Sequence, residues 1–272
     1  MIGSMTSSLI LIVLYLFFIG NSIIEGYKEV ENITTLLNTW LVASFVSLTA
    51  LTSVITPVSQ IIRDRETDVI QDFESAGLSN MKINISYIFS ATIVSFLMSL
   101  FSFLCSYPLI LLNGGVFISL PKLLLCLILI LLVSASSSIF IFSFVMFFKR
   151  SDTFSTFTTV ISPLCGFITG NYVPIGELPA IVQKIVQAFP LTQGSILLRN
   201  VLVKEQIQAL DINNSDQLTQ FYFKLGIMNN LYGIKDNFIL GVVYLVAGSI
   251  IFFLAIYTIE KCLIRKKNEV LL

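Results

Sequence analysis

The chemically most varied part of the sequence is a run of charged residues that follows the second long apolar stretch. Acids outnumber bases in this run, within a chain that contains only 12% charged residues. Val69, Ile70 and Phe73 can share one face of a helix there, and Gly77 can end that helix. An exposed helix with an apolar face and acidic flanks is suited to docking into a groove on a soluble partner. The residues that we assign to this docking region are Arg63, Asp64, Arg65, Glu66, Asp68, Val69, Asp72, Phe73, Glu74 and Gly77. An ordinary solvated loop that sets membrane topology is an equally good interpretation of the same residues.

Catalytic chemistry has little support elsewhere in the chain. The sequence contains no histidine, which excludes histidine metal ligands, histidine proton relays and His-based triads. It also lacks a G-x-x-x-x-G-K-[ST] motif, so the chain does not bind ATP through a P-loop. Cys105, Cys126, Cys165 and Cys262 do not form a metal-type cluster, and we interpret them as small apolar side chains. We therefore predict no catalytic residue, no metal site and no cofactor in this chain.

The elements that carry these residues are long and apolar. The chain has 272 residues, 56% of them hydrophobic, and its charged fraction is half of the value of about 25% found in soluble domains. A helix needs about 20 apolar residues to cross the hydrocarbon core of a membrane. We therefore predict an all-α integral membrane protein, a single domain over 1–272 with six transmembrane helices. The runs without Asp, Glu, Lys or Arg that predict them are 1–24, 32–62, 83–121, 123–148, 153–176 and 237–259.

Basic residues set the predicted orientation of these spans. With Met1 inside, the interior segments hold most of the Lys and Arg residues that lie near the span ends, as the positive-inside rule requires. Both termini are then cytoplasmic, 63–82 is a cytoplasmic connection and 201–236 is an extracellular segment. The interior basic residues are Arg63, Arg65, Lys82, Lys149, Arg150, Lys261, Arg265, Lys266 and Lys267.

The predicted spans contain no Asp, Glu, Lys, Arg or His, and this limits the function classes. Ion-coupled and proton-coupled carriers generally need such groups near the middle of the membrane, and the chain has no evident internal repeat of the kind found in many carriers. Small hydroxyl residues such as Thr156 and Thr158 usually serve helix packing, with substrate contact as the alternative. A secondary transporter or channel, and a membrane sensor or scaffold, stay open as alternatives; an intramembrane enzyme has no candidate nucleophile and base.

A second segment, from Gly170 to Arg199, carries three of the seven prolines of the chain. Its uncharged run of 14 residues after Lys184 is too short to cross a bilayer and has the length of a re-entrant helix. Proline is favoured in the first turn of a helix, where its missing N–H is not needed. We therefore predict two short re-entrant helices over 171–200, with Arg199 returning the chain to the outer surface. The residues assigned to this outer gate are Gly170, Pro174, Pro179, Pro190 and Arg199.

Three local expectations follow from single residues. Trp40 should lie at the outer membrane interface, where an indole ring is favoured. Pro57 should kink the second span. The segment from Ser215 to Gly226 can form a short helix, a lid or packing helix near the membrane surface. The alternative is a loop that rests on the spans.

The chain resembles the permease subunits of type-2 ATP-binding-cassette (ABC) exporters, which have six spans and both ends inside. Arg65-Glu66-Thr67 through Leu78-Ser79 is similar to the charged stretch after the second span of that family, with Gly77 in place of the usual proline. A more specific match covers the re-entrant segment. Its residues are Ser162-Pro163, Gly166, Gly170, Pro174, Leu178-Pro179, Phe189-Pro190-Leu191-Thr192 and Arg199. Family members usually begin with a cytoplasmic amphipathic helix, whereas here Met1 stands almost at the start of the first span.

This resemblance implies a function and a set of partners. It implies a bacterial exporter in the plasma membrane, in which 63–82 contacts the ATPase and 171–200 dips into the outer leaflet. Two separate ATPase subunits would bind ATP and magnesium, and a second permease, identical or similar, would complete the transporter within the lipid bilayer. The uncharged spans favour an amphiphilic cargo such as a drug, a lipid or an antimicrobial peptide, and no nucleic-acid partner is expected.

Overall fold

The computed structural model describes residues 33–112, 114–210, 222–223, 225–227, 230–231, 234–235 and 238–270. The predicted first span and most of the predicted helix over 215–226 lie outside these residues.

Four helical segments are long and apolar enough to cross a membrane. The first runs over Thr34–Glu66 and consists of α3 (Ile33–Thr52) and α4 (Ile55–Glu66). The others are α6 (Asn80–Leu112), α7 (Leu120–Val145) and the first 24 residues of α12 (Phe238–Val270). They coincide with the predicted second, third, fourth and sixth spans.

The predicted fifth span is a helix, α8 (Ser151–Ile168), but it is not one of these four. Serine and threonine recur along its 18 residues and lower its mean hydropathy. The structure therefore supports four of the six predicted spans by length and composition, and the count of six stays a prediction.

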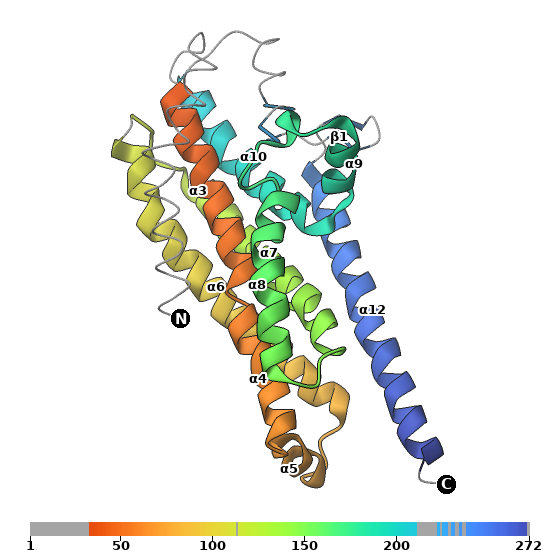
Figure 1. Cartoon of the computed structure of the whole chain (residues 1–272). Helices are drawn as coiled ribbons and strands as arrows, with labels where there is room; N and C mark the ends of the chain where they lie inside the picture. Colours follow the sequence, from red (N-terminus) through yellow and green to blue (C-terminus); the bar gives the residue numbers. More distant parts are fainter. Residues whose placement is uncertain are drawn as a thin grey trace.

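The long helices run side by side along one axis, with a short helix at each end of the bundle (Figure 1). The short helix α5 (Val69–Ser75) marks one end, which we call the α5 end, and α12 also finishes there. The opposite α9 end carries η2 (Ile175–Glu177), α9 (Ala180–Ala188) and a two-strand antiparallel pair, β1 (Asn230–Leu231) and β2 (Ile234–Lys235). In the sequence, α10 (Pro190–Leu210) follows α9 and precedes this strand pair; it crosses the bundle and packs on α3, α7 and α12.

Proline residues place several of these helix ends, as the sequence predicts. The break between α3 and α4 includes Ser53, four residues before Pro57, because a proline cannot donate to the carbonyl at that position and its ring clashes with it. Pro179 immediately precedes α9, and Pro190 is the first residue of α10. The second predicted short helix is wrong in length, since α10 continues for 11 residues beyond Arg199. No glycine or proline follows Arg199 in α10 to end the helix there.

The core is formed by apolar side chains of α3, α4, α6, α7 and α10, with smaller contributions from α8 and α12. Close approach of α10 to α12 depends on Gly248, where a Cβ atom would lie 2.4 Å from the ring of Pro190. Nearby, Phe140 of α7 makes edge-to-face contacts with Phe144, Phe189 and Phe252, at ring distances of 5.0 to 5.2 Å. These contacts fix the start of α10 between α7 and α12.

Candidate functional sites at the two ends of the bundle

The charged run at the α5 end folds as two helices joined by a sharp turn. Between α4 and α5, Asp68 has a φ of 63° in the left-handed region, which aspartate tolerates better than most residues. At the other end of α5, the N–H of Gly77 donates to the carbonyl of Glu74 at 3.0 Å and that of Leu78 to Phe73 at 3.2 Å. This is a Schellman ending with glycine at the left-handed position, φ 84°. The prediction that Gly77 ends the helix is therefore confirmed.

The apolar face of α5 differs from the predicted one. Ile70 packs against the core of the bundle and Val69 is half-buried, so they attach α5 to the other helices. The apolar residues that remain outside are Phe73, 38% exposed, and Leu78, 43% exposed. We call Phe73 and Leu78 the α5 tip. The same segment carries exposed acids, namely Asp68, Asp72 and Glu74.

Other residues of the predicted docking region connect α4 to neighbouring helices, while Arg63 is exposed. The carboxylate of Asp64 accepts hydrogen bonds from the hydroxyl of Tyr87 on α6 and, at 2.8 Å, from Gln60. The guanidinium of Arg65 turns inward, where its Nη2 lies 3.8 Å from the sulfur of Met146. These contacts leave Asp64 and Arg65 half-buried and therefore poorly placed to meet a soluble partner.

Glu66 joins the end of α4 to the start of α8. Its two carboxylate oxygens accept from the backbone N–H of Ser151 at 3.0 Å and from the Ser151 hydroxyl at 2.6 Å. A carboxylate at the first turn of a helix is favoured by the unpaired N–H groups and by the helix dipole. Ser151 was not predicted as a site residue, because nothing in the local sequence pairs it with a residue 85 positions earlier.

At the α9 end, Arg199 is fully buried, with 0% of its surface exposed. Its Nε donates to the hydroxyl of Ser44 at 3.0 Å, and its Nη2 donates to the carbonyl of Gly170 and the side-chain oxygen of Asn171, each at 2.6 Å. Its Nη1 is buried without a hydrogen-bond partner. The Arg199 side chain therefore does not reach the surface of the chain and joins α10 to α3 and to the turn after α8. The predicted return of the chain to the outer surface stays a prediction.

Trp40 also lies inside the protein, with 1% of its surface exposed. The centre of the Arg199 guanidinium lies 4.8 Å from its ring centroid, a cation–π contact. Its indole N–H donates to the carbonyl of Leu225 at 2.7 Å. The expected contact of this ring with the membrane interface is replaced by contacts within the chain.

The predicted outer-gate residues are partly brought together. Gly170 has a φ of 65° and lies against Ile175 and Arg199, and Pro174 immediately precedes Ile175 in the 3-10 turn. Pro179 and Pro190 begin the next two helices. A buried set of polar side chains that the sequence did not single out completes the cluster. Ser47 donates to Asn171 at 3.2 Å and lies 3.0 Å from the hydroxyl of Ser195.

Potential metal ligands do not gather in the part of the chain that the structure describes. Within the described ranges no group of three or more Cys, Asp or Glu side chains could hold a metal ion, and Cys126 and Cys165 are buried as free thiols.

Comparison with known proteins identifies the family. A family model described as ABC-2 family transporter protein matches residues 2–258, which is nearly the whole chain. The chain belongs to this family. It is thus a type-2 ABC permease, the membrane-spanning and non-catalytic component of an ABC transporter. The match decides against the secondary transporter, channel, sensor and scaffold alternatives. No curated protein and no solved structure matches the permease.

Proposed function

We propose that this permease is the transmembrane subunit of an ATP-driven exporter that moves an amphiphilic cargo out of a bacterial cell. Two ATPase subunits, which bind ATP and magnesium, drive it from the cytoplasm, and a second permease, identical or similar, stands opposite it in the plasma membrane. The observation that carries this proposal is the α5 tip, an exposed apolar pair among acids at the end of a bundle of apolar helices.

The α5 tip has the features of a docking surface for an ATPase. Phe73 and Leu78 offer an apolar contact, and Asp68, Asp72 and Glu74 favour a groove with basic edges. Force applied to α5 would reach α4 directly through the turn at Asp68 and α8 through the Glu66–Ser151 bonds. In this proposal the α5 end is cytoplasmic, in agreement with the distribution of basic residues.

The exposed face of α8 is suited to line the cargo path. Thr156 and Thr159 are exposed there, but each hydroxyl bonds to a carbonyl four residues earlier, Asp152 at 3.1 Å and Ser155 at 2.9 Å. These side chains therefore present methyl groups and weak acceptors without charge, next to the exposed Val160 and Leu164. Such a surface accommodates the apolar and polar parts of an amphiphile. We place the second permease opposite it.

Arg199 and the groups that it bonds, on Ser44, Gly170 and Asn171, would form the outer gate; we call them the Arg199 cluster. It holds the turn after α8 against α3 and α10 by hydrogen bonds at 2.6 to 3.0 Å. Opening a path between the permeases at the α9 end would require a movement of the turn at Gly170 and Asn171. Either Arg199 moves together with this turn, or the hydrogen bonds between them break.

The proposal is tested by recovery of the ATPase with the permease. Tagged permease is purified from its native cells, and the P-loop ATPase that co-elutes is quantified together with its ATP hydrolysis. We expect Phe73→Ala to lower ATPase recovery about thirty-fold, since truncating a central apolar anchor of an interface costs about 2 kcal/mol of binding free energy. Phe117→Ala is the matched control, because Phe117 is 79% exposed but lies between α6 and α7, away from α5. Absence of any ATPase with the unaltered chain, or intact export by the Glu66→Lys and Phe73→Ala double variant, contradicts the proposal.

A further inference from the structure

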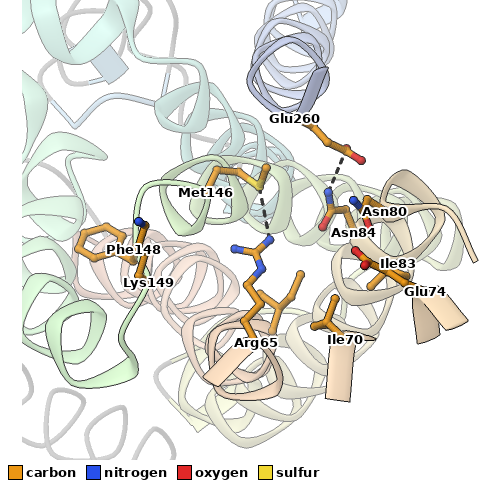
Figure 2. Close-up of a pocket in the computed structure, with 11 residues that line it drawn as sticks. Arg65, Ile70, Glu74, Asn80, Ile83, Asn84, Met146, Phe148, Lys149 and Glu260 are labelled. Atoms are coloured by element: carbon orange, nitrogen blue, oxygen red, sulfur yellow. Dashed lines mark hydrogen bonds between the residues drawn. The ribbon is translucent and has the colours of Figure 1, made fainter. Parts of the chain in front are cut away.

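A cavity of about 480 Å³ lies at the α5 end, between α4, α5, α6, the α7–α8 link and α12 (Figure 2). Its volume falls within the range of about 300 to 1,000 Å³ that is usual for ligand sites. Both apolar and charged side chains line it, the apolar ones including Ile61, Ile70 and Phe148. A ligand with one charged and one apolar part would match such a lining.

Opposite charges occupy opposite sides of this cavity. Arg65 and Lys149 lie on one side, and Glu74 and Glu260 lie on the other (Figure 2). No ion pair joins the two sides among the residues that the structure describes. The cavity therefore holds two cations and two carboxylates that do not neutralise each other by direct contact.

Arg65 has spare capacity for an anionic ligand. A guanidinium carries five N–H donors, and the single side-chain hydrogen bond of Arg65 within the described ranges goes to the sulfur of Met146, a weak acceptor, at 3.8 Å. Its planar fork matches the oxygens of a phosphate group. Lys149, exposed at the rim of the cavity, adds a second positive charge.

Glu260 is the carboxylate that can take up the cationic part of the same ligand, since Arg65 acts on it electrostatically without forming an ion pair. Only 7% of its surface is exposed, and its Oε2 accepts a hydrogen bond at 3.0 Å from the side-chain amide of Asn84. Removing a carboxylate from water is costly unless hydrogen bonds and an opposite charge compensate. An ammonium group in the cavity would supply that charge, with Glu74 at the rim as a second contact.

Apolar, exposed helix faces begin next to the cavity. On α6, Ile85 and Phe89 follow the cavity residue Asn84 and are 45% and 66% exposed. On α12, Leu254 and Tyr257 precede Glu260 and are 54% and 47% exposed. The charged cavity thus lies where the exposed apolar surface of the spans ends, which is where a lipid headgroup meets the acyl chains.

We propose that this cavity binds the zwitterionic headgroup of a phospholipid from the leaflet on the α5 side. The phosphate contacts Arg65 and Lys149, the ammonium group contacts Glu260 and Glu74, and the acyl chains run along the exposed faces of α6 and α12. A lipid bound in this way connects α4 and α5 to α12. The site shares Glu74 with the acids at the α5 tip, but it does not depend on which side of the membrane the α5 end faces.

Lipid binding to the full chain tests this proposal. Delipidated permease in detergent is mixed with phosphatidylethanolamine, phosphatidylglycerol or diacylglycerol of equal chain length, and bound lipid is counted by native mass spectrometry. We expect phosphatidylethanolamine to bind best. Arg65→Gln should weaken the binding of both phospholipids about ten-fold, because a charge-assisted hydrogen bond is lost. Glu260→Gln should weaken the binding of phosphatidylethanolamine but not of phosphatidylglycerol, so that the two phospholipids reach similar occupancy.

Controls separate this site from general lipid adhesion. Arg150→Gln removes a cation at the same end, 75% exposed and outside the cavity, and should leave binding unchanged. Lys149→Gln repeats the test at an exposed position if Arg65→Gln does not elute as a single species. Equal occupancy of all three lipids, or unaltered phosphatidylethanolamine binding to the folded cavity variants, overturns the proposal. Equally tight binding of soluble glycerophosphoethanolamine also overturns it, since the site would then bind a free zwitterion.

Discussion

Arg199 shows how much one residue can depend on distant parts of the chain. It is a fully buried cation whose partners are two hydroxyl or amide side chains, one carbonyl and the ring of Trp40, and no carboxylate lies within ion-pair distance in the described part of the chain. Such a charge is stable only while all of these groups stay in place, because water cannot replace them.

Replacement of Arg199 should therefore destabilise the permease strongly. Arg199→Met leaves the carbonyl of Gly170 and the side chains of Asn171 and Ser44 without this donor, at a cost of about 3 kcal/mol. Arg199→Lys should also destabilise it, since an ammonium group cannot reproduce the planar fork. Thermal unfolding in detergent measures the effect. Lys184→Met, at an exposed cation of α9, is the control, and an unchanged midpoint for Arg199→Met would refute the structural role of the cluster.

At the scale of elements, α4, α5 and α8 form one connected unit. The turn at Asp68 and the Schellman ending at Gly77 fix the direction of α5, and the Glu66 carboxylate holds the first residue of α8. Motion of α5 can therefore reach the α8 face without passing through the rest of the bundle.

Glu66→Ala should uncouple ATP hydrolysis from export. We expect cargo export to fall several-fold while ATPase recovery stays near the original level, because Glu66 bonds to Ser151 and is not part of the α5 tip. Export into inverted vesicles and ATP hydrolysis are measured on the same preparation. Asp152→Ala is the control, an acid in the first turn of α8 that is 89% exposed. A parallel loss of both activities would place Glu66 at the ATPase contact instead.

Helix boundaries were predictable from the sequence where local chemistry decides them. Gly77, Pro179 and Pro190 lie at helix ends as expected, and the second span is interrupted just before Pro57, where a kink was expected, since proline lacks an N–H and glycine tolerates a positive φ. The inward turn of Ile70 was not predictable, because it depends on the cavity between α4, α6 and α12. The candidate sites were also only partly predictable. The sequence singled out Gly170 and Arg199 but could not show that Trp40, 159 positions before Arg199, shields the charge.

For the whole molecule, the exposed apolar surface has more than one use. Exposed leucine, isoleucine and phenylalanine residues cover α6, α7 and α12, as expected for contact with lipid. The face of α8 differs by its hydroxyl residues, and we assign it to the second permease and the cargo path.

Cysteine cross-linking should locate that second permease. In a variant whose four native cysteines are alanine, Thr159→Cys on α8 should form a disulfide-linked pair of permeases in membranes, because two facing α8 helices would bring such thiols together. Ile251→Cys on α12, 65% exposed, should remain monomeric on a non-reducing gel. Cross-linking at Ile251→Cys alone would place the contact on α12.

The position of Arg199 along the chain has a consequence for biogenesis. Every group that bonds its guanidinium, on Ser44, Gly170 and Asn171, and the ring of Trp40 beneath it, belongs to a residue that the ribosome makes earlier. When α10 is synthesised, the hydrogen-bond acceptors of Arg199 are already present in the nascent chain. The guanidinium can therefore be paired as soon as α10 enters the membrane. The order of translation itself lowers the barrier to inserting the most polar side chain of the α9 end.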